Sequence, residues 1–200
     1  MIKLKNLLKE QSTVNPGQAL KQVDSSGKSI KVPPKEIITN SEFRAAMTKL
    51  ANTWNPIRNQ YKDKKVNFFD KSGGLISNFK IENIVVKYYA GKEGLLPYVV
   101  LSISDTTNLA MKGIATAYEV DLEINAFEVG KRGLGGSIPP KFQLINKSLA
   151  KSILSKWPAI DRIAGELMNI QNKHRVPDAD FTAAIDSELG NDDIQSTNIA

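Results

Sequence analysis

Two apolar stripes at helical spacing bracket the middle of this sequence and fix most of what it can fold into. The first stripe recurs at steps of three and four residues, at Phe43, Met47, Leu50, Trp54, Ile57 and Tyr61. The second has the same kind of spacing, at Leu149, Ile153, Trp157, Ile160, Ile163, Leu167 and Ile170. Such spacing places each stripe on one helix face, which must be buried against another element. Each stripe contains a proline, Pro56 or Pro158, where we expect the helix to kink, break or restart.

The sequence also indicates where helices begin and end. Thr39, followed three residues later by Glu42, has the pattern of a capping box, so we expect Thr39 to be the N-cap of the first long helix. Near the other end, Phe181, Ile185 and Leu189 recur at steps of four in an acidic segment. This spacing predicts a short acidic helix that a glycine ends.

Between the stripes the sequence has the shorter periodicity of β-strands. The run "KVNFF" leads into the turn "DKSGG", and the next strand changes its buried parity at Glu82–Asn83, as a β-bulge there would cause. Residues 96–104, "LPYVVLSIS", are apolar at both parities, which predicts a strand covered on both faces. Residues 114–125 alternate strictly, with the large apolar side chains at even positions. We expect one long strand there, with its even positions buried.

Together these elements predict an α+β fold, an antiparallel meander of about four strands flanked by N-terminal and C-terminal helices, because short connections join antiparallel neighbours. We expect a short helix and flexible arm over residues 1–35, a single α+β domain over 36–175, and an acidic helix and tail over 176–200. The arm is rich in Ser, Gly and Pro, as linkers are. No apolar run reaches the ~20 residues of a membrane span, so no membrane partner is expected.

Composition narrows the chemistry that the chain can carry. There is no cysteine and one histidine, His174, so zinc sites of Cys and His are hard to build. No G-x-S-x-G motif is present, which argues against a nucleophilic triad. Charge is uneven: six acidic and no basic residues lie from Asp178 onward, whereas the first 177 residues hold all 27 basic and 15 acidic residues, a net charge of +12. This asymmetry favours a polyanionic partner or self-association; a solvated surface with a solubilising tail is the alternative.

The glycine-rich stretch "GKRGLGGSIPPK", residues 130–141, is the nearest approach to a catalytic motif. In a phosphate-binding P-loop the glycines precede a lysine and a helix, but here Gly136 occupies the lysine position and Pro139 and Pro140 prevent a helix from starting at once. We therefore expect a flexible basic loop and no cofactor.

Three acidic residues form a second candidate site. Alternation would place Glu119, Asp121 and Glu123 on one strand face, with neighbours ~6.8 Å apart. Carboxylates so arranged can hold Mg²⁺ in a metal-dependent nuclease. The acid-x-lysine pair expected beside them is missing, so the alternative is that they face water or pair with lysines across strands.

Basic residues beside aromatic ones form a third candidate, a nucleic-acid-binding surface. The rings of Tyr61, Phe68 and Phe69 could stack on bases, or could belong to the core. The basic residues expected to contact phosphates are Arg58, Lys62, Lys64, Lys65, Lys131, Arg132 and Lys141.

The first ten residues, "MIKLKNLLKE", carry one resemblance to a known family. They resemble the N-terminal capsid-targeting peptides of proteins packed into the heads of large contractile-tailed bacteriophages, which end in Leu/Ile-x-Glu before the cut of a prohead protease. Leu8-Lys9-Glu10 fits that pattern, over ten residues of 200. The resemblance implies a processing site at Leu8 and Glu10, with the mature chain starting at Gln11.

From the resemblance and the charged ends, the leading hypothesis is a non-enzymatic structural or assembly protein of a phage particle, located in the host cytoplasm and the virion. Its partners would be other virion proteins or further copies of itself. The alternatives are a DNA-binding protein that uses its basic surface, and a metal-dependent nuclease that uses the three carboxylates.

Overall fold

The computed structural model describes residues 21–23, 29–31, 35–92, 94–107, 112–129 and 142–190. The expected helix near the N-terminus, the processing site at Leu8 and Glu10, the glycine-rich loop and the acidic tail after residue 190 all lie outside these ranges. Of the arm, two short strands are described, β1 (Lys21–Val23) and β2 (Ser29–Lys31), which pair antiparallel as a sheet of their own.

A closed barrel of antiparallel strands forms the centre of the fold. Its strands pair in chain order, and β3 closes the barrel by pairing with β8. They are β3 (Lys65–Phe69), β4 (Leu75–Gly91), β5 (Gly94–Asp105), β6 (Lys112–Ala117), β7 (Ala126–Val129) and β8 (Gln143–Ile145). The predicted α+β class, with an antiparallel meander and flanking helices, is confirmed. The strands number six instead of about four, because β7 and β8 are too short to show an alternation in the sequence.

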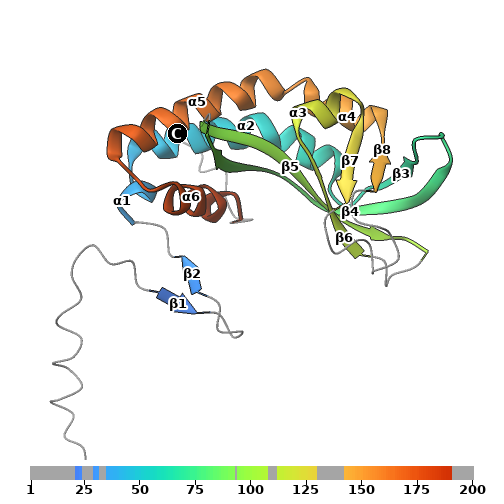
Figure 1. Ribbon diagram of the computed structural model, residues 1–200, viewed down its shortest axis with the longest axis horizontal. Coiled ribbons are helices and arrows are strands. Elements are labelled where there is room, and N and C mark those ends of the chain that lie inside the picture. Colours follow the sequence, from blue (N-terminus) through green and yellow to red (C-terminus); the bar gives the residue numbers. More distant parts are fainter. Residues whose placement is uncertain are drawn as a thin grey trace, which may run out of the picture.

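Two long helices cover one side of the β4–β5 hairpin. Figure 1 shows α2 and α5 lying along the long strands, while α3 and α4 lie at the barrel end and α6 lies near the tip of the hairpin. The helices are α1 (Lys35–Ile38), α2 (Ser41–Tyr61), α3 (Glu119–Glu123), α4 (Lys147–Leu154), α5 (Trp157–His174) and α6 (Asp178–Gly190). Every member of both apolar stripes is buried, as predicted.

Polar contacts fix these two helices against the hairpin. The indole Nε1 of Trp54 in α2 donates a hydrogen bond to the carbonyl of Ile84 at 3.0 Å. The phenol of Tyr88 lies 3.5 Å from the carbonyl of Ile160 in α5. At the tip, Gly94 has φ +115° and stands so close to Met168 of α5 that a Cβ would collide with its sulfur. These contacts hold the inner face of the hairpin against α2 and α5 from Ile84 to the tip at Gly94.

The helix limits differ in detail from the prediction. Asn40, not Thr39, is the N-cap of α2: its side-chain oxygen accepts from the backbone N–H groups of Glu42 and Phe43 at 2.9 and 3.0 Å. The hydroxyl of Thr39 instead donates to carbonyls of α1. The expectation for Thr39 was wrong, because the adjacent Asn40 belongs to a residue type that favours the N-cap position at least as strongly as threonine.

The two prolines act differently from each other. α2 continues through Pro56, which is exposed, so water can replace the hydrogen bond that the helix loses there. The second stripe divides at residues 155–156, and Pro158 lies in the first turn of α5, where its missing N–H has no helical acceptor. The acidic helix is confirmed as α6, with Phe181 against Phe43 of α2 at a ring distance of 5.6 Å.

The predicted bulge in β4 is confirmed. Ile81 faces Ile103 and Asn83 faces Ser102, which leaves Glu82 as the extra residue. The bulge reverses the parity of β4, so Phe79 and Ile81 before it and Ile84 and Val86 after it are all buried on the same side of the sheet.

The prediction for residues 114–125 was wrong in length and in parity. β6 ends at Ala117 and the helix α3 begins at Glu119, so the expected long strand is a strand followed by a helix. Within β6 the small residues Ala115 and Ala117 are fully buried, while Ile114 is 54% exposed. The interior of the barrel is already filled by large rings, which leaves room only for small side chains from β6. These rings are Phe68, Phe79 and Phe127, with Phe68 about 6 Å from each of the others.

The expectation that β5 is covered on both faces also fails within the described chain. Its odd positions are buried, but its even positions from Gly94 to Ser102, Leu96, Tyr98 and Val100 among them, are only half-buried. None of the helices in the described ranges is both long and apolar enough to cross a membrane.

The reversed parity of β6 can be tested by placing a charge at two adjacent positions. We expect Ile114→Asp to change the free energy of unfolding by less than ~1 kcal/mol, because its side chain points to solvent. Ala115→Asp should cost more than ~3 kcal/mol, because it places an unpaired charge inside the barrel. Urea denaturation of the two variants measures both values, and equal or inverted costs would contradict the assigned parity.

Candidate protein interface

The outer face is the side of β4, β5 and β6 that points away from α2 and α5. Register places its residues in rows across the three strands: Val85 pairs with Val100 and Val100 with Thr116, Lys87 pairs with Tyr98, and Ser102 with Ile114. The members of the outer face are Val85, Lys87, Tyr89, Leu96, Tyr98, Val100, Ile114, Thr116 and Tyr118. Most of these side chains are apolar or aromatic, which is unusual for the wet face of an antiparallel sheet.

Three tyrosines form a cluster on the outer face. Tyr98 stacks on Tyr118 with ring centroids 5.6 Å apart and planes at 29°, and Tyr89 meets both rings edge-on at 6.1 and 5.9 Å. Tyr89 is 39% exposed and Tyr118 is 43% exposed. Tyrosine is enriched at the centres of protein interfaces because a rigid ring buries a large area at little entropic cost, while its hydroxyl can stay hydrogen-bonded.

Aliphatic side chains continue the outer face beyond the tyrosines. Ile114 of β6 is 54% exposed, four residues before Tyr118. After Tyr118, Val120 and Ile124 are 70% and 55% exposed. Val120 and Ile124 lie one helical turn apart, in α3 and just after it. The largest apolar patch on a protein surface is often a functional one, so these exposed side chains make this side of the sheet a candidate interaction site.

The three candidate metal-binding carboxylates border the outer face but do not lie on a strand. Glu119, Asp121 and Glu123 belong to α3, and Asp121 accepts a hydrogen bond from the backbone N–H of Tyr118 at 3.0 Å. The prediction that the three acids share one face of a strand was wrong, because they lie on a helix, in which Glu119 and Glu123 are one turn apart. Within the described ranges, no group of three or more acidic or histidine side chains is placed to hold a metal ion.

These acids and one more form an acidic rim, defined as Glu119, Asp121, Glu123 and Glu128. Glu128 lies in β7 opposite Thr116, and therefore beside the outer face. Partial burial raises the pKa of the Tyr118 phenol, and the neighbouring Tyr89 and Tyr98 raise it further. The negative charges of Asp121 and Glu128 in the rim add to this increase.

The predicted nucleic-acid-binding residues are only partly brought together. Lys62, Lys64 and Lys65 lie at the corner where α2 ends and β3 begins, and the last two are exposed. Arg58 lies one turn earlier on α2 and is half-buried. Lys131, Arg132 and Lys141 fall outside the described residues.

The aromatic part of that prediction fails for two of its three rings. Phe68 is fully buried inside the barrel, and Tyr61 is buried with its hydroxyl 2.9 Å from the Oγ of Ser152. These rings belong to the core and are not available to stack on bases. Phe69 is half-buried and lines a pocket instead.

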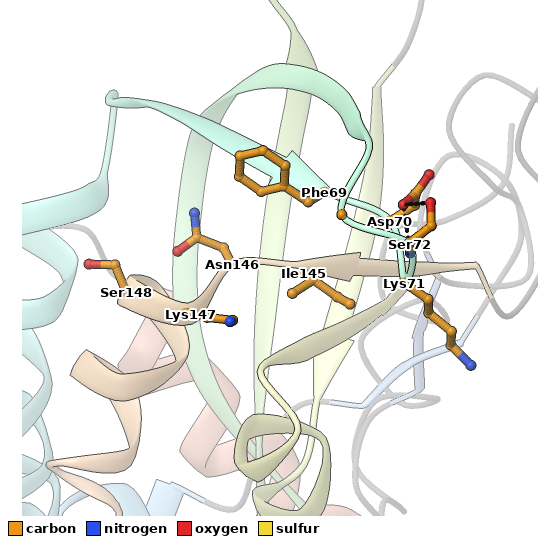
Figure 2. A pocket seen from close by; sticks show the side chains of 9 residues that line it. Phe69, Asp70, Lys71, Ser72, Ile145, Asn146, Lys147 and Ser148 are labelled. Carbon is orange, nitrogen blue, oxygen red and sulfur yellow. Dashed lines mark hydrogen bonds between the residues drawn. The ribbon is translucent and has the colours of Figure 1, made fainter.

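That pocket, of about 600 Å³, lies between the turn after β3 and the start of α4. Figure 2 shows Asp70, Lys71 and Ser72 on one side and Asn146, Lys147 and Ser148 on the other. Two of the polar groups hold the local backbone. Asp70 accepts three hydrogen bonds from Ser72 and Gly74, which lower its pKa. Asn146 caps α4 and donates to the carbonyl of Asn67.

His174, the single histidine, ends α5, and its Nε2 lies 3.2 Å from the side-chain nitrogen of Asn40. Asn40 is also the N-cap of α2, so this contact joins the ends of two helices. The contact therefore gives the histidine a structural role at the junction of the two helices.

The sequence analysis named none of the three clustered tyrosines as a site. One signal was present, because residues 96–104 are apolar at both parities although nothing in the described chain covers their second face completely. The sequence was interpreted as a doubly covered strand, whereas the same pattern also suits a strand whose second cover is a binding partner.

Comparison with known proteins found no matching family model, no matching curated protein and no matching solved structure.

The packing of the tyrosine cluster predicts a raised pKa for the phenol of Tyr118. We expect Tyr118 to ionise above the ordinary value of 10, with a transition at 295 nm that Tyr118→Phe removes. Because the pKa of the folded state is raised, the contribution of the neutral phenol to stability is complete below pH ~10 and is lost as pH rises through the folded value. A Tyr118 transition at or below the ordinary value would contradict the packing of the cluster.

Proposed function

We propose that this chain is a non-enzymatic assembly protein that binds other proteins through its outer face, and that it works in a phage particle. The observation that supports binding is the tyrosine cluster on the outer face, together with the exposed Ile114 of β6 and Val120 of α3. The phage setting is supported by the resemblance of residues 1–10 alone.

The energetics of the outer face suit a binding surface. Complete burial of a large apolar side chain is worth ~1.5–3 kcal/mol, and Ile114, Val120 and Ile124 each still expose more than half of their surface. The tyrosines are held by one another and by the sheet, so they have little side-chain freedom to lose on binding. A partner that covers these groups would therefore gain several kcal/mol at a small entropic cost.

The test uses the full chain and proteins of the particle. The immobilised chain should retain a virion protein from dissociated particles of its source, and the same protein, once purified, should bind in calorimetry. Ile114→Asp should weaken that binding at least tenfold, because it places a charge on an apolar position of the outer face that the partner would cover. Asn59→Asp, an equal change at an exposed position of α2 on the other side of the fold, should leave the affinity within twofold.

Two results would overturn this proposal. One is that no virion protein binds the chain. The other is that a bound protein responds equally to Ile114→Asp and to Asn59→Asp, which would place the contact elsewhere.

A second candidate function is DNA binding through the lysine corner, defined as Lys62, Lys64, Lys65 and Lys80. Lys65 and Lys80 are direct cross-strand partners, so two like charges stand side by side, and Asp63 pairs with Lys80 at 2.7 Å. Asp63 and Glu82 partly neutralise Lys80, so the phosphate-attracting charge of the corner comes mainly from the other three lysines. The corner lacks stacking rings, because Phe68 and Tyr61 are buried, so any contact would be to the DNA backbone without sequence preference.

A salt series on duplex DNA tests this second function. If the lysine corner contacts phosphates, log affinity should fall linearly with log salt, and Lys64→Gln with Lys65→Gln should reduce the slope by about 2. Lys49→Gln with Lys156→Gln removes the same charge from other surfaces and serves as the control. Equal slopes for the two double variants would show that the corner is not the contact.

A further inference from the structure

The outer face and its acidic rim together define what could cover them. The apolar part of the outer face is three strands wide, which is ~10 Å from the backbone of β4 to that of β6. It runs along about six residues of β5, a length of ~20 Å. With side chains this is an area on the order of 300 Å², well below the ~800 Å² that each partner commonly buries in a stable complex. An area of this size suits one short helix, which is ~10 Å wide, better than it suits the face of a second folded copy.

The charge of the rim adds a second requirement. Glu119, Glu123 and Glu128 are exposed, and none of them belongs to an ion pair within the described ranges. At the opposite border, Lys87 is already paired with Asp186 of α6 at 3.0 Å. The occupant should therefore be apolar on one side and basic along the border that meets α3 and β7.

Residues 1–10 of this same chain have that chemistry. If the segment is helical, four of its apolar residues share one side of the helix, within an arc of ~120°. They are Met1, Leu4, Leu7 and Leu8. Lysines flank this arc on both sides, and the segment holds three lysines and one glutamate. As a helix it would be ~15 Å long, comparable to the ~20 Å of apolar surface along β5.

We propose that residues 1–10 dock as an amphipathic helix on the outer face of their own barrel, with the leucines over Tyr98 and Val100 and the lysines toward the acidic rim. This inference rests on the proposed function, because it takes the outer face as a protein-docking surface. The proposal adds that residues 1–10 of the same chain bind this face. An external partner would therefore have to displace them before it could bind there.

The connection is long enough for docking within one chain. Residues 11–34 separate the segment from α1, and residues 21–31 of this stretch fold back as the β1–β2 pair. The other 13 residues, 11–20 and 32–34, reach up to ~45 Å when extended, about the span of a domain of this size. The entropic cost of closing such a loop grows only with the logarithm of its length, so a modest contact can hold the segment in place.

A spin label in the full chain tests the proposal. The chain has no cysteine, so Ser12→Cys gives a single attachment point for a nitroxide next to the segment. Relaxation enhancement should be strong at the amides of Val100 and Thr116 on the outer sheet. It should be weak at Gly165 of α5, on the opposite side of the fold.

Matched variants separate docking from chance proximity. Leu4→Asp with Leu7→Asp should reduce the enhancement at Val100 and Thr116 at least fivefold, because it places charges on the apolar arc. Ile2→Asp with Asn6→Asp adds the same number of charges to the opposite side of the expected helix, and should leave the enhancement within twofold. Glu119→Gln with Glu123→Gln and Glu128→Gln should lower it at low salt, since it removes the charges that attract the lysines.

Each other outcome overturns the proposal and leaves the proposed function separately testable. Equal enhancement at the outer sheet and at Gly165 means that the segment does not dock. Enhancement that appears only when labelled and isotope-enriched copies are mixed means that a second copy occupies the face. Loss of enhancement in the Ile2 and Asn6 variant equal to that in the leucine variant means that only net charge matters. In every case, the effect of Ile114→Asp on partner affinity still decides the proposed function.

Discussion

The packing of the β4–β5 hairpin on α2 and α5 is the constraint on which the rest of the structure depends. The hairpin is longer than the barrel, and its inner face supplies the surface that buries both helical stripes. Glu82, the bulge residue, lets one strand serve both the barrel and the helix layer, because it reverses parity where β4 leaves β3. Once the inner face is occupied in this way, the opposite parity of β5 must face outward. The apolar outer face is thus a direct consequence of the packing inside.

The sequence predicted the elements whose periodicity is long and regular. Both helical stripes, the acidic helix and the bulge were found because a continuous side-chain pattern identifies a buried face without knowledge of its partner. The pattern of residues 114–125 was misleading because alternation identifies two faces but not which one is buried. The choice was made by the barrel interior, where Phe68 and Phe127 leave space for alanine and not for isoleucine. That information lies in other strands and could not be obtained from β6 alone.

The candidate interface was less predictable than the fold, for a related reason. The tyrosine cluster joins residues of β4 and β5 with the residue that follows β6, and only the strand register brings Tyr89, Tyr98 and Tyr118 together. The sequence identified the acids of α3 as a group and, on the assumption that they lie on a strand, suggested a metal site. They lie on a helix instead, where they border an apolar surface. The pocket near α4 could not be foreseen either, because it joins segments about 75 residues apart in the sequence.

The central claim is that the outer face is covered when the protein works. Hydroxyl-radical footprinting of the chain within its native assembly tests this most directly, because it reports the solvent access of individual phenols. The account predicts that Tyr98 and Tyr118 are oxidised about as slowly as Tyr88, which is only 4% exposed in the core. Oxidation of Tyr98 and Tyr118 at the rate of exposed tyrosines in that assembly would contradict it.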